Sequence, residues 1–188
     1  SLYMKYAQKG DKEAMYNLAT CYLNGSGGVS QDYSIAFRWF EKSAKKNYGP
    51  AQFMTAYCCL YGIGTEQNWK TAWKIADKAV SEGFRQAYWI KAQLFKLGYM
   101  VDPNMFYVKY LTSAATSGYS VAQAELGVLY LYGSDEAKVE QNMYNAVKWL
   151  KMAAENNDDD GLYYLGLCYE NGLGGLPKDQ EKAWECYE

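Results

Sequence analysis

The chain has 188 residues, 49% of them hydrophobic, and its 20 Tyr and 6 Trp supply enough apolar surface for a packed core, which excludes intrinsic disorder. The formal net charge is −2, and the Lys and Arg residues do not form a basic stripe that could bind the phosphates of a nucleic acid. We therefore expect no nucleic acid partner. Lys, Gln or Glu interrupts each long apolar run, which excludes direct insertion into a membrane and predicts a soluble protein.

A two-helix unit recurs along the chain. Its first helix opens at a small residue and closes at a glycine, and a loop then leads to a second amphipathic helix. Successive closing glycines are 35 to 39 residues apart, a period that indicates a solenoid of stacked repeats. The opening residues are Ala14, Ala51, Ala87, Ala122 and Gly161, and the closing glycines are Gly25, Gly62, Gly98, Gly133 and Gly172.

Capping residues at the second helices keep the same register. An N-cap side chain accepts a hydrogen bond from an unpaired backbone N–H at the start of a helix, and Gly or Asn tolerates the left-handed conformation that closes one. Caps and apolar positions therefore predict the same helices independently. The predicted N-caps are Asp32, Asn68, Asn104, Asn142 and Asp179, and the predicted closing residues are Asn47, Gly83, Gly118 and Asn157.

Further columns follow the same period and have a packing role. A small residue five positions after the opening residue lets a neighbouring helix approach closely, and an aromatic residue three positions later brings bulk to the same face. The small column is Ala19, Ala56, Ala92, Gly127 and Gly166. The fullest copies are residues 14–47, with Leu18, Ala19, Tyr22, Gly25, Asp32, Ala36, Trp39 and Ala44, and residues 122–157, with Leu126, Gly127, Tyr130, Gly133, Asn142, Ala146, Trp149 and Ala154.

This pattern resembles the Sel1-like repeat, a relative of the tetratricopeptide repeat, over nearly the whole chain. The resemblance implies an all-α fold, a right-handed superhelical α/α solenoid of stacked helix-loop-helix repeats. A plain tetratricopeptide array fits less well because its unit has a constant length, whereas the inter-helix loop here has six residues in copy one and eight in copy four. Copies two and three depart from the pattern, since Thr55 and Lys91 replace the first-helix hydrophobic residue and Val108 replaces the second-helix alanine.

We predict a single repeat array over residues 1–188. Residues 1–10 align with the end of a second helix, and the final helix is short, so we expect the chain to be a slice of a longer array. The predicted repeats are residues 11–47, 48–83, 84–118, 119–157 and a truncated 158–188.

Catalytic and cofactor chemistry finds little support in the sequence. The absence of histidine removes the usual general base and the common nucleophile pairs. The glycine-rich turn at residues 25–28 follows a helix and lacks the Lys-Ser/Thr ending of a phosphate loop, and the acidic run at residues 156–160 lacks the ligand spacing of a calcium loop. We therefore expect no enzyme, no cofactor and no metal site.

The five cysteines are Cys21, Cys58, Cys59, Cys168 and Cys186, and none forms a C-x-x-C motif. All fall within helical patterns, where a free cysteine is usually a small buried hydrophobic residue. A disulfide-stapled subfamily of Sel1-like proteins exists, so the resemblance leaves open a bridge between Cys168 and Cys186. The odd number slightly favours a cytoplasmic location over a secreted, periplasmic or ER-lumenal one.

The surface of the array is the remaining candidate site. In a helical-repeat superhelix the first helices line the concave face, and positions counted from the Leu18 column are rich in Tyr, Phe and Trp, which anchor interfaces. The alternative is that these aromatic residues only fill the space between stacked helices. The predicted partner-binding residues are Tyr16, Phe53, Tyr57, Tyr61, Trp89, Gln93, Tyr132 and Tyr163.

The leading functional hypothesis is a non-catalytic scaffold or adaptor that binds a peptide or protein partner in the concave groove and assists complex assembly, as the resemblance implies. An alternative is a structural or self-associating segment of a larger protein, with homo-oligomers formed through terminal repeats. A third is a hydrolase like one β-lactamase-related Sel1-like group, which needs an activated serine.

Overall fold

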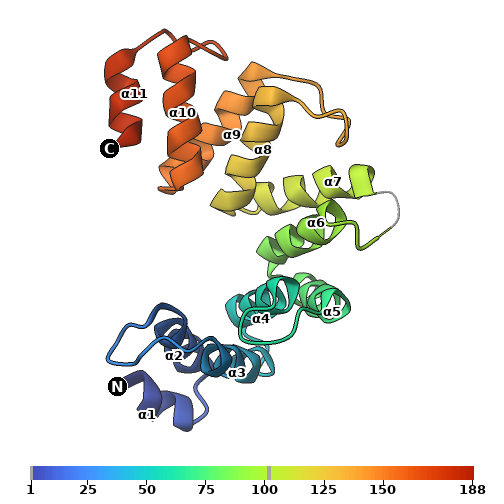
Figure 1. Ribbon diagram of the computed structural model, residues 1–188, viewed down its shortest axis with the longest axis vertical. Coiled ribbons are helices and arrows are strands. Elements are labelled where there is room, and N and C mark those ends of the chain that lie inside the picture. The colour runs from blue at the N-terminus through green and yellow to red at the C-terminus, as the bar shows by residue number, and fades with distance from the viewer. Residues whose placement is uncertain (1, 101–102) are drawn as a thin grey trace. The chain divides into compact units, whose positions relative to one another are not determined.

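The structure is a computed structural model that describes residues 2–100 and 103–188, without the side chains of residues 103–105. Over these residues the regular structure consists of eleven α-helices and one 3-10 helix, with an isolated β-bridge between Ser134 and Val139 (Figure 1). The all-α prediction is confirmed. None of the described helices has the length and apolar character needed to cross a membrane.

The chain forms two compact units, residues 1–94 and 95–188, and the boundary between them falls within α6. The helices before the boundary are α1 (Leu2–Gln8), α2 (Lys12–Asn24), α3 (Tyr33–Ala44), α4 (Gly49–Tyr61), α5 (Trp69–Ser81) and η1 (Arg85–Ala87). The boundary helix is α6 (Tyr88–Lys96), and it is followed by α7 (Pro103–Thr116), α8 (Ser120–Tyr132), α9 (Met143–Glu155), α10 (Asp159–Asn171) and α11 (Gln180–Tyr187).

Consecutive helices pack against each other within each unit. In the N-terminal unit α2 packs on α3 and α4 on α5, and α3 of one pair packs on α4 of the next. The C-terminal unit repeats this order, with α8 on α9, α10 on α11, and α9 on α10. Each pair therefore buries its apolar faces partly internally and partly against the following pair, as stacked repeats do.

Side-chain caps begin most of these helices. The carboxylate or amide oxygens of Asp32, Asn68, Asn142 and Asp179 each accept a hydrogen bond from the backbone N–H three residues later, over 2.8 to 3.0 Å. These four predictions are confirmed. Helix α7 begins at Pro103, so the fifth predicted cap, Asn104, lies within the helix, and its side chain is outside the described part of the chain.

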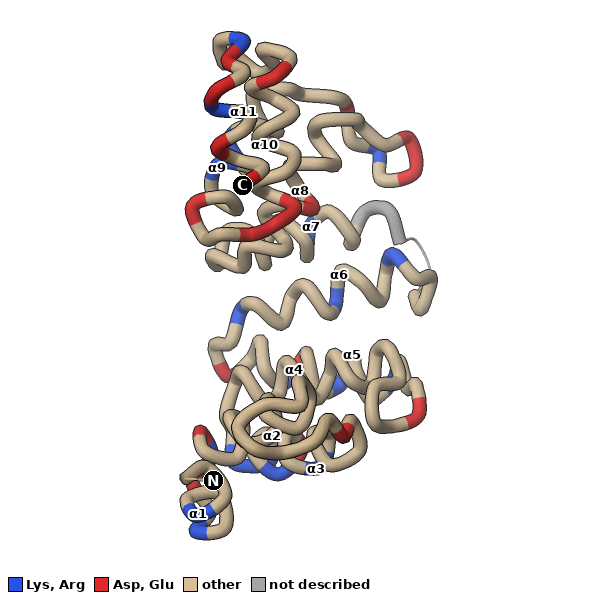
Figure 2. Tube along the Cα trace, turned by 60° about the vertical axis from the view of Figure 1, so that its left-hand side comes forward, with Lys and Arg blue, Asp and Glu red and all other residues tan. Residues whose placement is uncertain are grey.

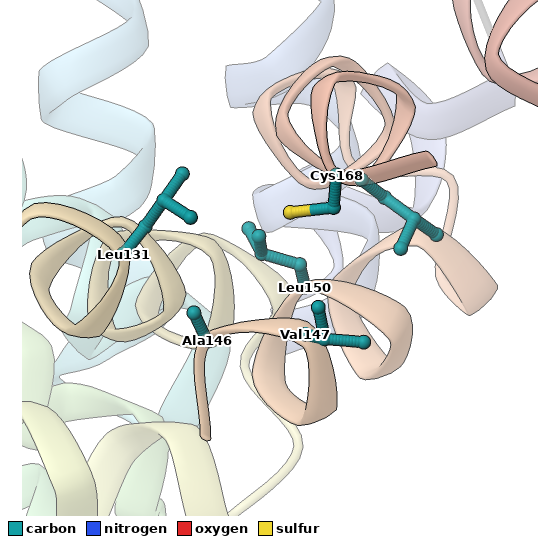
Figure 3. Close-up of a cluster of buried hydrophobic side chains, with 6 residues drawn as sticks. Leu131, Ala146, Val147, Leu150 and Cys168 are labelled. Carbon is teal, nitrogen blue, oxygen red and sulfur yellow. The ribbon is translucent and has the colours of Figure 1, made fainter. Parts of the chain in front are cut away.

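The small column permits close helix packing, as predicted. A methyl group added to Gly127 would lie 2.7 Å from Cγ of Leu150, because α9 passes close to α8 at this point. Leu150 is fully buried between Leu131 of α8 and Cys168 of α10, in a cluster that also includes Val147 (Figure 3). This cluster of the C-terminal unit is thus built from three consecutive helices.

Two polar residues occupy the first-helix column that holds Leu18 and Leu126 in other copies. Thr55 is buried and its hydroxyl donates to the carbonyl oxygen of Ala51 over 2.7 Å. Lys91 is also buried, with 6% of its surface exposed. Its Nζ lies 2.6 Å from Oδ1 of Asp77 and 4.2 Å from the centroid of the Trp73 ring. These two polar substitutions are therefore compensated by specific partners.

The second glycine of the loop in two copies makes a contact that the sequence analysis missed. Gly64 and Gly174 have φ of +67° and +60°, and an added methyl group would collide with the carbonyl groups of Tyr33 and Met143 respectively. These carbonyl groups belong to the first turn of the second helix in the preceding copy. The absence of a side chain thus lets one repeat's loop lie directly on its neighbour.

Candidate functional site

The structure brings together four of the predicted site residues on α4 and α6 of the N-terminal unit. The ring centroid of Tyr57 lies 4.8 Å from that of Tyr61, 6.5 Å from that of Phe53 and 6.1 Å from that of Trp89. Phe53 and Trp89 are 6.3 Å apart. We call Phe53, Tyr57, Tyr61 and Trp89 the N-terminal aromatic cluster.

Exposure divides this cluster into a buried base and an accessible edge. Phe53 and Trp89 are only 9% and 8% exposed, so they fill the space between α4 and α6. Tyr57 is half-buried and Tyr61 is 41% exposed. Within this cluster the two tyrosines therefore present the accessible ring surface. Phe53 and Trp89 pack against the ring of Tyr57.

The other two predicted residues of this unit lie in different surroundings. Tyr16 of α2 is half-buried, with its ring centroid 5.5 Å from Phe40 and 5.6 Å from Tyr48. Gln93 is buried, with 6% exposure. Gln93 therefore offers little surface to a partner, and packing against Phe40 and Tyr48 accounts for much of the surface of Tyr16.

A second aromatic group lies in the C-terminal unit. The ring of Tyr164 is 6.3 Å from that of Tyr132 and 5.1 Å from that of Tyr163, and Tyr163 is 5.9 Å from Tyr187. Tyr132 and Tyr163 are 62% and 51% exposed, so most of their rings face solvent. We call Tyr132, Tyr163, Tyr164 and Tyr187 the C-terminal aromatic cluster.

Sequence reasoning found two members of this cluster and missed Tyr164 and Tyr187. The adjacent pair Tyr163-Tyr164 was a usable signal, because neighbouring residues on a helix point in directions about 100° apart, and one of them therefore turns toward α8. Tyr187 comes from α11, and its contact with Tyr163 depends on how α10 and α11 pack. That contact has no local sequence signal.

A surface hollow adjoins each cluster. In the N-terminal unit a hollow of about 470 Å³ lies at the C-terminal ends of α2 and α4, and it is mainly apolar, with Leu23, Met54, Tyr57 and Ile63 among its lining residues. In the C-terminal unit a hollow of about 590 Å³ follows the α8–α9 loop, where Tyr132 lines it together with charged residues. Each hollow shares a tyrosine with the neighbouring cluster.

The two units differ in charge. Residues 1–94 contain 12 Lys and Arg and 7 Asp and Glu, a net charge of +5, whereas residues 95–188 contain 7 and 14, a net charge of −7. Figure 2 marks these charges along each unit, and the α8–α9 loop is visibly acidic. Similar aromatic surfaces therefore lie in electrostatic fields of opposite sign.

Three of the five cysteines, Cys58, Cys59 and Cys168, are buried. Burial, with a smaller contribution from Cys59, raises the pKa of Cys58 to about 12, and burial raises the pKa of Cys168 to about 11. Cys168 and Cys186, the pair left open by the resemblance, are both free thiols. Within the described ranges, no three His, Cys, Asp or Glu side chains gather as a metal ion would require.

Comparison with known proteins identifies the repeat. The Sel1 repeat profile matches residues 12–48, 49–84, 120–158 and 159–188, which together make up most of the chain. The crystal structure of a Sel1 repeat protein from Oxalobacter formigenes is similar with a TM-score of 0.81 and 28% identity, over 98% of this chain and 72% of that one.

Among curated proteins, the mouse protein named DAP3-binding cell death enhancer 1 is 35% identical over 160 residues, which cover 84% of this chain and 30% of that protein. Chitin synthase regulatory factor 3 of Schizosaccharomyces pombe is 26% identical over 198 residues, covering 100% of this chain and 21% of the factor. The chain thus spans less than a third of the length of these relatives. On the repeat profile and the matching fold, this chain belongs to the Sel1 repeat family.

Proposed function

We propose that this chain is a non-catalytic protein-interaction scaffold, and that the exposed tyrosines of its first helices bind segments of partner proteins. The observation that carries the proposal is the same in both units: tyrosines at 41% to 62% exposure stand on other packed rings beside a surface hollow. The continuous concave groove through all repeats, and the repeat boundaries, stay predictions from the sequence.

Tyrosines held in this way suit partner binding for a physical reason. A Tyr side chain offers a large amphipathic surface and loses little conformational entropy on binding. Tyr57 rests on Phe53 and Trp89, and Tyr163 on Tyr164, so part of their freedom is already lost in the unbound chain. Pre-ordering of contact residues lowers the free-energy cost of association.

The names of the relatives support a role exerted through other proteins. One is named for binding DAP3 and another for regulating chitin synthase. Neither name describes a reaction catalysed by the repeat protein. The partner of this chain is a separate matter, because the chain matches only 30% and 21% of those proteins.

The proposal is tested by affinity capture from a lysate of the cells that produce the protein. The wild-type chain is compared with a triple variant, Tyr61→Ala, Tyr132→Ala and Tyr163→Ala, and with the control Tyr144→Ala, which removes a ring that is 73% exposed on the second helix α9. We expect a protein that the wild type and the control retain and the triple variant loses. Equal retention by all three chains would refute binding through the first-helix tyrosines.

Self-association is the second candidate function, favoured by the opposite charges of the two units. Net charges of +5 and −7 on one chain favour head-to-tail contacts between copies at low ionic strength. Sedimentation equilibrium over a range of protein and salt concentrations measures this directly. A mass equal to that of one chain at every concentration would exclude it.

A further inference from the structure

We propose that the C-terminal aromatic cluster, together with the carboxylates around it, binds a basic, arginine-containing segment of a partner protein. The inference rests on the proposed function and adds the chemistry of the partner for one of the two units. It is carried by three observations: exposed ring faces, carboxylates placed beside those rings, and an excess of negative charge over the whole unit.

The exposed rings form a connected surface. Tyr132 at the end of α8 contacts Tyr164, which contacts Tyr163 on the same helix, α10. The planes of both ring pairs meet at 78°, so the edge of one ring meets the face of the other, and the exposure of Tyr132 and Tyr163 leaves ring surface open to solvent. An open tyrosine face carries partial negative charge and attracts a cation.

Two carboxylates lie next to rings of the cluster. Asp160 lies one helical turn before Tyr164 on α10, which places the two side chains on one face. Burial first, and then Tyr132 and Asp160, raise the pKa of Tyr164. At another ring of the cluster, the Tyr187 hydroxyl donates to Oε2 of Glu170 over 3.3 Å.

The hollow along the α8–α9 loop extends this acidic surface. Tyr132 lines it with Asp135 and Glu140, and Lys138 is the cation among its lining residues. Asp135, Lys138 and Glu140 are exposed, so their charges face whatever enters the hollow. An incoming cation would thus meet two carboxylates, one ring and one lysine within a single depression, where the carboxylates outnumber the lysine.

Arginine fits this combination better than lysine. A guanidinium is planar, stacks on an aromatic face and donates two parallel hydrogen bonds to a carboxylate. Lysine offers a strongly hydrated point charge that satisfies the carboxylates but stacks poorly. An acidic segment would be repelled, since the unit already has a net charge of −7.

The N-terminal aromatic cluster serves as an internal control. It contains the same ring type at its edge, Tyr57 and Tyr61, but lies in a unit with a net charge of +5. Ring chemistry alone would let both clusters bind the same peptide. The proposal requires the C-terminal cluster to bind basic sequences selectively.

The test uses short fluorescein-labelled peptides of alternating Arg and Gly, Lys and Gly, or Glu and Gly, titrated with the whole chain in fluorescence anisotropy. We expect the Arg peptide to bind most tightly, the Lys peptide less tightly, and the Glu peptide not at all. The double variant Tyr132→Ala and Tyr163→Ala should weaken Arg-peptide binding about tenfold, the loss expected for two cation–π contacts. Asp135→Asn with Glu140→Gln should weaken it several-fold and flatten its salt dependence.

Matched controls separate this site from general charge attraction. Tyr144→Ala on α9 and Tyr61→Ala in the N-terminal unit should leave the Arg-peptide affinity unchanged. The proposal would be overturned if the control variants lost as much Arg-peptide affinity as the ring variant. It would also be overturned if the Tyr132→Ala and Tyr163→Ala variant bound the Arg peptide as tightly as the wild type. A ring variant that loses only self-association would overturn it as well, since the site would then bind a second copy of the chain.

Selection of random displayed peptides on the wild-type chain distinguishes failure of this inference from failure of the proposed function. Enrichment of basic sequences that the Tyr132→Ala and Tyr163→Ala variant no longer retains supports both. Enrichment of neutral or acidic sequences keeps the scaffold function and overturns the basic partner. Enrichment of nothing, with no captured partner in the lysate experiment, overturns both.

Discussion

Replacing Lys91 tests how a charged residue is accommodated in a column that is otherwise apolar. The Lys91 side chain is 7% exposed, and its Nζ contacts the carboxylate of Asp77 over 2.6 Å. The Asp77 side chain is 59% exposed, so water already reaches one end of the pair. The stem of Lys91 therefore contributes as a buried hydrocarbon, while the ion pair is partly screened.

The magnitudes follow from this asymmetry. Lys91→Ala removes three buried methylene groups, and at about 0.8 kcal/mol each plus a cavity contribution the expected loss of unfolding free energy is about 2–4 kcal/mol. Lys91→Met keeps the volume and removes the desolvated charge, so we expect a change within about 1 kcal/mol. Asp77→Asn leaves the ammonium with a neutral acceptor and nearby water, and should cost about 1 kcal/mol.

The assay is urea unfolding of the four chains, followed by far-UV circular dichroism and tryptophan fluorescence in parallel. The ring centroid of Trp73 lies 4.2 Å from Lys91 Nζ, so among the six tryptophans that contribute to the fluorescence Trp73 reports on this site. Two probes are needed because repeat chains unfold in stages when contacts between neighbours weaken. If Lys91→Met lost as much stability as Lys91→Ala, the ion pair and not stem packing would dominate, and the reasoning would be wrong.

Four further predictions concern individual side chains. Gly64→Ala combines a positive φ with a backbone clash, so we expect it to lower the free energy of unfolding in urea by more than about 2 kcal/mol. Gly28→Ala is the control: Gly28 has a φ of +83° but open space around it, so the expected loss is only about 1–2 kcal/mol. Cys58, whose pKa is raised to about 12 mainly by burial, should react with iodoacetamide at neutral pH at least about a hundredfold more slowly than in the denatured chain. Because the folded state holds that thiol protonated, its contribution to stability is present at neutral pH and lost as the pH rises from about 9 toward 12, which alkaline titration of the unfolding midpoint measures. Phe53→Ala should cost about 3–5 kcal/mol and Tyr61→Ala less than about 1 kcal/mol, so equal thermal shifts for the two variants would contradict the assignment of base and edge.

Features with local causes were predictable from the sequence. An N-cap side chain accepts a hydrogen bond from a backbone N–H only three residues away, so the residue type alone indicates where a helix begins. The structure has such caps at Asp32, Asn68, Asn142 and Asp179. The small column likewise follows from its period alone. The burial of Lys91 was not predictable, since its partners come from α5, 14 and 18 residues earlier in the chain, and only the packed fold brings them together.

The burial of the individual side chains and the distribution of charge between the two halves were not predicted from the sequence. Counting positions along a helix gives the direction of a side chain but not how much of it the neighbouring helix covers, which is why Phe53 and Trp89 appeared equivalent to Tyr61. The total charge of −2 concealed net charges of +5 and −7 in the two halves. The charge of each half needs only the sequence and could therefore have been counted before the structure.

The position directly before each closing glycine shows how such a chain can change partners at low cost in stability. Packing columns restrict most first-helix residues, but the left-handed turn at the glycine leads the chain away from the helix surface. The five residues at this position are Asn24, Tyr61, Leu97, Tyr132 and Asn171, and all are exposed. Because exposed substitutions usually change stability by less than about 0.5 kcal/mol, this position is free to carry amide, aliphatic or aromatic chemistry from one copy to the next. Under the function proposed above, the charge of the surrounding unit would then select the partner segment that a tyrosine there binds.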